Sequence, residues 1–214
     1  MALPGSKLLT WCLNAVFPRF CVNCQTEGAL LCQTCLAAWE HEPPAPASDH
    51  ISLFAYANPL VRQLICTWKY TYDQSAFELL KAEASLQLAP FKSQLSALGV
   101  EAIMPLPLSP KRLRERGFNQ SRLLADWLAG ELNLPVCEGL ERTHRAGHQA
   151  DLGYDERRLA MAQSPFRLKA GTPVPAKILL VDDVWTTGAT LGAAKGILEQ
   201  QAGTQVFALT LAEG

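Results

Sequence analysis

The sequence predicts an α/β domain with a mostly parallel, twisted sheet and flanking helices, preceded by a small cysteine-rich module. After residue 51, strand-like segments alternate with segments of helical periodicity, and the segments 177–182 and 205–212 each contain a run of apolar residues. Such runs are typical of strands buried on both faces of a parallel sheet. With the helix between them they make a βαβ unit. The other observation is a group of four cysteines within residues 21–35.

Composition and charge exclude several classes of protein. The chain has 214 residues, 49% of them hydrophobic, which is enough for one medium-sized core plus an appendage. The formal net charge is -1, so any basic site for a partner must be local. No run of about 18 apolar residues occurs, which excludes a membrane span. The first 17 residues are interpreted as a short amphipathic helix rather than a signal peptide, because Pro18 and Arg19 follow at once and no small-residue cleavage site is present. The expected location is therefore cytoplasmic.

Four cysteines have the spacing of metal ligands. Cys21, Cys24, Cys32 and Cys35 follow the pattern C-x2-C-x7-C-x2-C, which can place four thiolates tetrahedrally around one zinc ion. The alternatives are two disulfides, which the cytoplasm disfavours, or a redox pair, for which one C-x-x-C would suffice. We predict a structural zinc ion that supplies the folding free energy of this short segment. The unpaired cysteines are interpreted as ordinary small buried residues: Cys12, Cys66 and Cys137.

A proline-rich stretch follows the cysteines. Residues 41–50 hold three prolines and show no apolar periodicity, as is typical of a semi-rigid linker. We predict a zinc module with its N-terminal helix over 1–45, a linker over 46–50, and a single α/β domain over 51–214.

The first half of the α/β domain is predicted to contain a strand, two helices and a second strand. Residues 51–57 are a strand-sized apolar run. Residues 58–68 and 75–89 place apolar side chains at helical spacing. Residues 100–108 begin as a strand and break at their two prolines, since proline donates no ladder hydrogen bond.

The second half begins with an amphipathic helix and ends with the βαβ unit. Apolar periodicity of 3.6 predicts the helices, and continuous apolar runs predict the strands. The expected helices are 118–133, 155–162 (one or two turns) and 190–201, and the expected strands are 134–140, 177–182 and 205–212.

An acidic pair follows the apolar run of the strand at 177–182. We expect that strand to end at Val181, which places Asp182 and Asp183 at its carboxyl end, where open α/β sheets bind ligands. Carboxylates there can accept hydrogen bonds from sugar hydroxyls or act near a divalent cation. The alternative is a plain helix start with Thr186 or Thr187 as N-cap and solvated aspartates.

The turn after the acidic pair consists of small residues. Thr186, Thr187, Gly188, Ala189 and Thr190 leave backbone N–H groups uncovered at the positive end of the next helix, which suits a phosphate. The spacing of a Walker loop is absent. Carboxylates beside a phosphate cradle predict a sugar phosphate with free hydroxyls as the ligand.

A basic loop is predicted at 111–117, before the helix that starts at Phe118. Its arginines suit a diphosphate, because guanidinium forks match phosphate oxygens. The loop could equally contact nucleic-acid phosphates, or be a solvated charged loop. Its basic residues, opposed only by Glu115, are Lys111, Arg112, Arg114 and Arg116.

Residues 181–190, V-D-D-V-W-T-T-G-A-T, closely resemble the 5-phosphoribosyl 1-diphosphate (PRPP) binding motif of type I phosphoribosyltransferases. The resemblance implies that Asp182 and Asp183 contact ribose hydroxyls and that residues 186–190 hold the 5'-phosphate. With the four cysteines and the segment R-E-R-G-F-N-Q, the chain resembles the ComF/GntX family over nearly its whole length. That family combines a zinc module with a type I phosphoribosyltransferase-like domain, and it includes competence proteins implicated in DNA uptake.

The resemblance also assigns residues to the diphosphate. Arg114, Arg116, Asn119 and Gln120 are carried over, because a mobile loop between the same strands of type I transferases closes over the diphosphate. Lys69, with Tyr70, resembles the family's K-Y pair; the alternative is an ordinary helix end where a lysine suits the dipole. A transferase of this kind uses Mg²⁺ with PRPP. The implied catalytic residues are Asp182, Asp183, Arg114 and Arg116.

The acceptor side of the site matches the family less well. Residues 141–152 keep Arg142, but His144 and Ala146 stand where the family tends to show a basic residue and a threonine. An expected asparagine near residue 160 is also missing. His144 and His148 are candidates for a general base, although a histidine on a polar loop is more often solvated. The acceptor is therefore not predicted.

Three functions stay open. The first is a competence protein with a phosphoribosyltransferase domain that binds PRPP. The second is a non-catalytic adaptor that retains a PRPP site and contacts single-stranded DNA or an uptake protein such as a competence helicase; Phe20 and Trp39 would give its zinc module a thin stacking platform. The third is a GntX-like role in gluconate use. Trp185 either packs in the fold or stacks on a base.

Overall fold

The computed structural model describes residues 18–40, 50–71, 73–143, 164–201 and 203–214. The predicted N-terminal helix, the linker up to residue 49, the turns at 155–162, and Cys12, His144 and His148 lie outside the described residues. No helix within the described ranges has the length and apolar character needed to cross a membrane.

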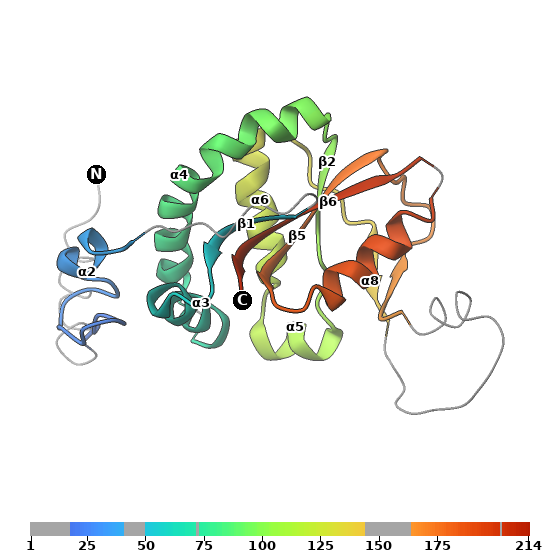
Figure 1. Cartoon of the computed structure of the whole chain (residues 1–214). Coiled ribbons are helices and arrows are strands. Elements are labelled where there is room, and N and C mark those ends of the chain that lie inside the picture. The colour runs from blue at the N-terminus through green and yellow to red at the C-terminus, as the bar shows by residue number, and fades with distance from the viewer. Residues whose placement is uncertain (1–17, 41–49, 72, 144–163, 202) are drawn as a thin grey trace, which may run out of the picture.

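A four-stranded parallel sheet forms the centre of the molecule (Figure 1). All three pairings between neighbouring strands are parallel, which confirms the predicted α/β class. The order across the sheet is β1 (His50–Ala55), β6 (Gln205–Glu213), β5 (Lys177–Trp185) and β2 (Ala102–Pro105).

Helices and a small ribbon cover the two faces of the sheet. Successive side chains of a strand point to opposite faces, so Leu179 and Val181 join one buried cluster while Ile178 and Leu180 join the other. The first cluster is closed by α3 (Pro59–Tyr70), α4 (Gln74–Leu98) and α6 (Gln120–Leu132). The second is closed by α8 (Ala189–Leu198) and the antiparallel ribbon of β3 (Leu140–Arg142) and β4 (Phe166–Leu168).

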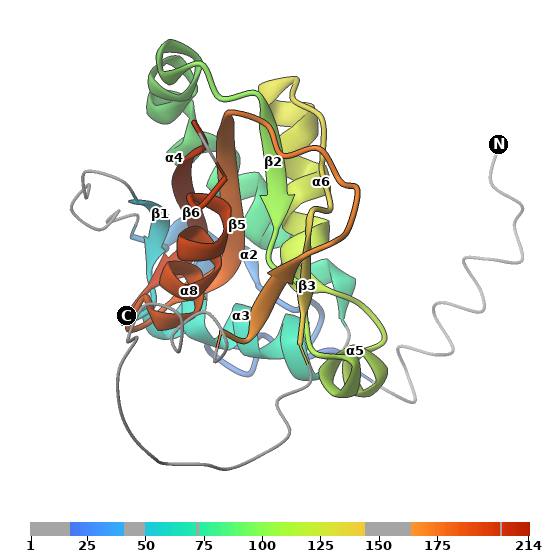
Figure 2. The ribbon, with the colours of Figure 1, turned by 90° about the vertical axis from the view of Figure 1, so that its right-hand side faces the viewer.

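The prediction for 111–117 was wrong, because the segment is a helix rather than a loop. Helix α5 (Pro110–Arg116) starts at Ser109, whose side chain accepts from the Arg112 N–H, and ends at Gly117 in the left-handed conformation. Serine at the N-cap, proline in the first turn and glycine after the last are the usual signals of a helix. The high density of charge concealed them. Figure 2 shows α5 at the same end of the molecule as α3.

Two element boundaries and one strand also differ from the prediction. Helix α4 does not stop at residue 89 but passes through the exposed Pro90 to Leu98, because its buried face continues to Leu95. Strand β5 does not end at Val181, since it stays paired with β6 as far as Trp185. The strand expected at 134–140 is reduced to a single bridge between Val136 and Ile103.

The cysteine module packs on the sheet domain through side chains of its own. Cys21, Cys35 and Trp39 belong to the same buried cluster as α3 and α4. The Trp39 ring lies 5.6 Å from the ring of Phe54 on β1. Two residues of the four-cysteine cluster are therefore part of the core of the large domain.

Candidate functional site

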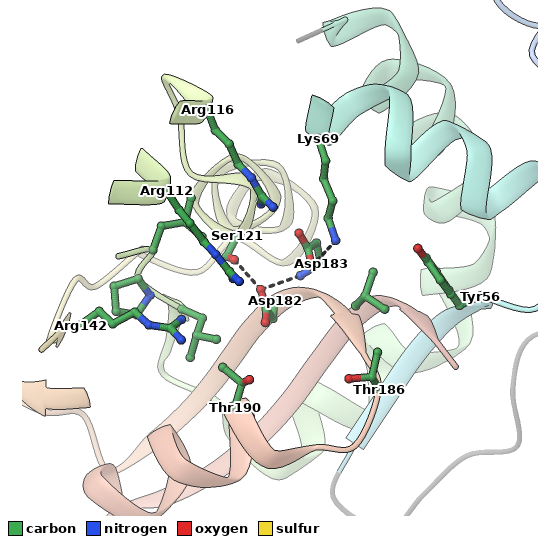
Figure 3. Close-up of a pocket in the computed structure, with 14 residues that line it drawn as sticks. Tyr56, Lys69, Arg112, Arg116, Ser121, Arg142, Asp182, Asp183, Thr186 and Thr190 are labelled. Atoms are coloured by element: carbon green, nitrogen blue, oxygen red, sulfur yellow. Dashed lines mark hydrogen bonds and ion pairs between the residues drawn. The ribbon is translucent and has the colours of Figure 1, made fainter. Parts of the chain in front are cut away.

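A cavity of about 250 Å³ opens at the carboxyl end of β5 (Figure 3). Its walls come from seven parts of the chain: the segment after β1, the end of α3, the loop before α5, α5 itself, the start of α6, β3, and β5 with the turn that follows. Segments more than 100 residues apart in sequence thus meet at the sheet edge where open α/β sheets bind ligands.

Asp183 is held by a lysine from α3. The Nζ atom of Lys69 lies 2.9 Å from Asp183 Oδ1, and the two side chains are only 14% and 13% exposed. Lys69 is in the last turn of α3, rather than after the helix. The ammonium group of Lys69 therefore lies directly beside the two adjacent aspartates.

Asp182, in contrast, is held by hydrogen bonds. Its Oδ1 atom accepts from Ser121 Oγ at 2.7 Å and from the backbone N–H of Asp183 at 2.9 Å. Burial, and then the negative charge of Asp183, raise the pKa of Asp182 to about 7, although both hydrogen bonds favour the charged form. The carboxyl group of Asp182 therefore titrates closer to neutral pH than an ordinary aspartate.

The turn after β5 depends on a close contact between a glycine and a tryptophan. Gly188 has φ +70°, and a Cβ there would lie 2.4 Å from Trp185 Cζ2. Trp185 in turn stacks on the buried His50, with ring centroids 3.9 Å apart. Trp185 therefore packs in the fold, and Gly188 is a position that only glycine fits.

The N-cap of α8 is Gly188, not Thr186 or Thr187. Because this residue is a glycine, no N-cap side chain binds the first turn of α8. The Oγ1 atom of Thr187 accepts a hydrogen bond from the Ala189 N–H at 3.4 Å. Thr186 and Thr190 line the cavity. The turn thus presents hydroxyls and a helix N-terminus to the cavity, as an anion cradle requires.

Three arginines form the opposite wall of the cavity. Arg112 and Arg116 lie one turn apart on α5 and both line it, whereas Arg114 is exposed and does not. Arg142 enters from β3, and its guanidinium lies 5.2 Å from the centroid of the Phe166 ring. Burial, and then the nearby charge of Arg112, lower the pKa of Arg142. Cations held this close to each other favour an anion between them.

Asn119 and Gln120, predicted to contact the diphosphate, do not line the cavity. The Asn119 side chain caps α6 by accepting from the Ser121 N–H at 3.1 Å, and it donates to the Leu106 carbonyl at 3.0 Å. Gln120 is fully buried, and its Oε1 accepts from Arg116 Nη1 at 3.2 Å. Both residues therefore contact the elements that form the arginine wall of the cavity, rather than the cavity itself.

The structure brings together some of the predicted residues and adds others. Ser121 had no signal in the sequence, whereas Arg112 was predicted as part of the basic segment and lies at i, i+4 spacing to Arg116. Predicted residues that line the cavity are Lys69, Arg112, Arg116, Asp182, Asp183, Thr186 and Thr190, and polar lining residues that were not predicted as site residues are Tyr56, Ser121 and Arg142.

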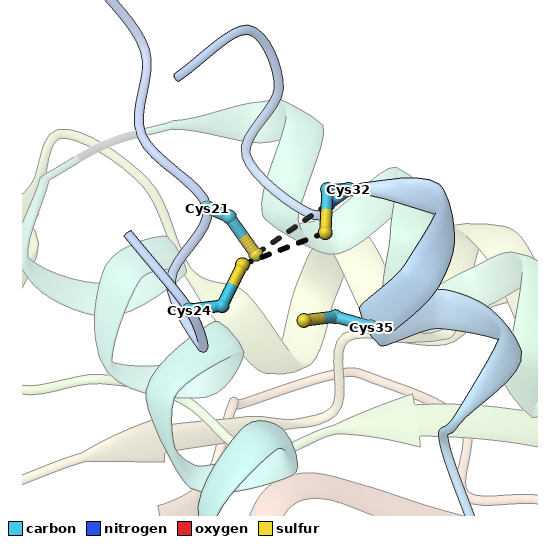
Figure 4. Close-up of side chains that lie close together, drawn as sticks. All are labelled: Cys21, Cys24, Cys32 and Cys35. Atoms are coloured by element: carbon cyan, nitrogen blue, oxygen red, sulfur yellow. Dashed lines mark hydrogen bonds between the residues drawn. The ribbon is translucent and has the colours of Figure 1, made fainter. Parts of the chain in front are cut away.

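The four cysteine sulfur atoms form a compact cluster (Figure 4). All four lie within 4.8 Å of one another, and the Sγ atoms of Cys24 and Cys32 are 3.6 Å apart. Thiolates about 2.3 Å from a central zinc ion would be separated by about 3.8 Å. The cluster therefore fits a tetrahedral metal ion.

The thiols of this cluster differ in acidity. Burial opposes ionisation of Cys21, but hydrogen bonds from the backbone N–H groups of Cys24 and Cys32 outweigh it and lower the pKa to about 6. The Asn23 amide favours the thiolate of Cys35, but the neighbouring thiols raise its pKa to about 12. Four thiolates so close together need a cation among them.

The module offers little aromatic surface for nucleobases. Trp39 is only 6% exposed and packs on Phe54, so the predicted stacking platform is wrong at this residue. Phe20 is 47% exposed. The described module, residues 18–40, has one basic side chain, Arg19, against two acidic ones.

No protein-family model matches the chain. Among curated proteins, the chain is 33% identical over 192 residues to "Competence protein ComFC" of Streptococcus pneumoniae, covering 89% of this chain and 79% of that protein. It is 32% identical to "Competence protein F" of Haemophilus influenzae, covering 86% and 80%. It is 29% identical to "DNA utilization protein YhgH" of Escherichia coli K12, covering 86% and 79%.

Solved structures give weaker likenesses. An adenine phosphoribosyltransferase from Saccharomyces cerevisiae has a TM-score of 0.43 and 15% identity, with 85% of this chain and 87% of that chain covered. The orotate phosphoribosyltransferase from Aeropyrum pernix has a TM-score of 0.38 and 21% identity, with 71% and 64% covered. Scores this low do not establish a shared fold, so the fold rests on the strands and pairings described above.

Proposed function

We propose that this chain, which belongs to the ComF family of competence proteins, binds PRPP in the cavity beside β5 and acts in DNA uptake as a phosphoribosyltransferase. The observation that carries the proposal is the meeting of two carboxyl groups, a glycine-centred phosphate cradle and three arginines in one cavity. A ribose with a phosphate at one end and a diphosphate at the other has the matching order of groups. The motif of residues 181–190 supports the same ligand.

Each part of the ligand has a counterpart in the cavity. The turn at 186–190 would hold the 5'-phosphate through backbone N–H groups and hydroxyls. Asp182 and Asp183 would accept hydrogen bonds from the ribose hydroxyls and stabilise positive charge that develops at the anomeric carbon. Arg112 and Arg116 would hold the diphosphate as it leaves. The chain supplies position and charge, with no protein nucleophile required.

Two metal ions belong to the proposal. Mg²⁺ would arrive with the diphosphate and neutralise part of its charge. The four-cysteine cluster would hold zinc as a structural ion in the cytoplasm, where thiols stay reduced. The acidic balance of residues 18–40 disfavours contact with nucleic-acid phosphates, so we propose that this module stabilises the fold or binds a protein of the uptake machinery.

The experiment is isothermal titration of the zinc-loaded chain with PRPP and Mg²⁺. We expect saturable binding by the wild type and its loss in the double variant Asp182→Asn/Asp183→Asn, whose melting temperature is measured as a control for folding. Absence of heat with the wild type, or unchanged heat with the variant, contradicts PRPP binding. Transformation frequency of a knockout complemented with the same double variant then tests the role in DNA uptake, and full restoration would show that the PRPP site is dispensable for it.

A further inference from the structure

Ser121, at the start of α6, contacts one of the two acidic residues of the cavity and has no role in the PRPP motif. We infer that Ser121 is a positioning residue: its hydroxyl orients Asp182 so that one carboxylate oxygen is held by the protein and the other is left for a ribose hydroxyl. This inference rests on the proposed function and assigns it a residue from outside the sequence motif.

The hydroxyl of Ser121 is fixed by its surroundings. The residue is only 1% exposed, and it contributes to the lining of the cavity beside Asp182. The backbone N–H of Ser121 is already bound by Asn119 Oδ1 at 3.1 Å, which fixes the first turn of α6. The hydroxyl is therefore placed by a capped helix, and it donates to Asp182 Oδ1 at 2.7 Å.

The consequence for Asp182 is an unequal division of its two oxygens. Oδ1 accepts both hydrogen bonds, one from Ser121 and one from the Asp183 N–H. A carboxylate fixed through one oxygen presents the other in a defined direction, and Asp182 lines the cavity. A carboxyl group in a partly apolar site is costly to leave without donors, so the hydroxyl also favours the charged form that accepts from a sugar.

A comparison with Asp183 shows what a neutral donor does for Asp182. Asp183 is held by the ammonium group of Lys69 at 2.9 Å, which provides a full positive charge. Asp182 is held by a hydroxyl and an amide, which orient it without neutralising it. The same hydroxyl opposes the rise that burial causes in the pKa of Asp182.

A purely structural role for Ser121 predicts a different behaviour from a positioning role. A structural residue would lower stability when changed, with no specific effect on Asp182. A positioning residue would change the titration of Asp182 and the pH dependence of ligand binding. The matched control is Ser52→Ala, which also removes a buried serine hydroxyl, here one bonded to Thr210 at 2.7 Å and outside the cavity lining.

The test uses the full zinc-loaded chain with three variants: Ser121→Ala, Ser121→Thr and Ser52→Ala. The carboxyl carbon of Asp182 is followed by NMR against pH in protein labelled with ¹³C-aspartate, and PRPP·Mg²⁺ affinity is measured between pH 6 and 9. In Ser121→Ala we expect the pKa of Asp182 to rise above its wild-type value. We also expect affinity at pH 7 to fall about tenfold, the scale for losing one hydrogen bond to a charged group.

Ser121→Thr keeps a hydroxyl and is expected to restore both the titration and the affinity, whereas Ser52→Ala moves neither. An unchanged Asp182 titration together with an unchanged pH profile in Ser121→Ala would overturn the inference. If the wild type binds no PRPP, the proposed function fails, and the titration of Asp182 alone decides whether Ser121 positions it: a raised pKa supports this and an unmoved one refutes it.

Discussion

The cysteine cluster and the cavity beside β5 are assembled in opposite ways. All four sulfur atoms of the cluster come from fifteen consecutive residues, 21–35. The cavity draws its charged groups from α3, α5, β3 and β5, between Lys69 and Asp183. A site whose ligands are close in sequence can be predicted as a whole from spacing. A site that the tertiary fold assembles reveals only the part that lies on one motif.

The two regions also differ in how they depend on the rest of the fold. The cluster adds Cys21 and Cys35 to the main core, so the loss of the cluster should lower the stability of the fold. The cavity depends on a few polar contacts at the end of the sheet, so the loss of these contacts should change the positions of its side chains. Changes in the first region should therefore act on unfolding, and changes in the second on binding.

The largest effect is expected from Cys21→Ser. Cys21 is fully buried and shares a core with Trp39, so loss of the metal should lower the free energy of unfolding of the whole chain by on the order of several kcal/mol. Bound metal is measured by mass spectrometry and unfolding by near-UV circular dichroism. Cys137→Ser, outside the cluster, is the control. Loss of metal without a change in unfolding of the sheet domain would show that the two regions are independent.

A smaller effect, on binding, is expected from the arginines of the cavity. Arg112→Gln and Arg142→Gln should each weaken PRPP·Mg²⁺ binding about tenfold, because each removes a charge-assisted contact. Arg114→Gln, on the same helix but outside the cavity lining, should change it less than about twofold. Titration calorimetry at fixed ionic strength compares the three. Equal losses at Arg112 and Arg114 would favour a general electrostatic attraction over the specific wall seen here.

The smallest effect concerns pH. The pKa of Asp182 is raised from 3.8 to about 7, so the folded chain keeps a proton that the unfolded chain releases between these values. The wild type therefore loses stability, relative to Asp182→Asn, as pH rises through this range. We expect the difference to grow by on the order of 1 kcal/mol between pH 6 and 7.5, measured by urea unfolding. A difference that is constant with pH would mean that Asp182 is solvated like an ordinary carboxyl group.

Much of the fold follows from the sequence because the pattern of apolar residues in a strand or helix shows which of its faces are buried. The parallel pairing of β5 with β6 was predicted in this way. The errors arose where a local signal was overridden or concealed. The helix predicted over 75–89 ended before Pro90, but the burial of Leu95 extends α4 past this proline. The charges of α5 concealed a cap that the Ser109 side chain and Gly117 provide.

The site was predicted mainly on the side of the motif, and on the facing side Lys69 and Arg116 are predicted residues that line the cavity. Thr186 and Asp182 are neighbours in sequence, so the pattern contains them both. Ser121 and Arg142 approach Asp182 only because α6 and β3 are placed there by packing, and no spacing in the chain encodes that distance. Asn119 and Gln120 were assigned to the ligand by likeness alone, and in the structure they serve the backbone of α6 and the side chain of Arg116.

The extra length of β5 gives the two walls of the cavity different rigidity: the acidic wall on β5 is more rigid than the basic wall on α5. Because its pairing with β6 continues to Trp185, the acidic residues stand on a hydrogen-bonded strand that opens only with the sheet. The arginines of α5 stand on seven residues with none buried, a helix that can open at little cost. Backbone amides of the acidic wall should therefore exchange with solvent far more slowly than those of the basic wall. Under the proposed function, α5 would adjust to ligands of different size, while the carboxyl groups on β5 would keep the sugar in a fixed place.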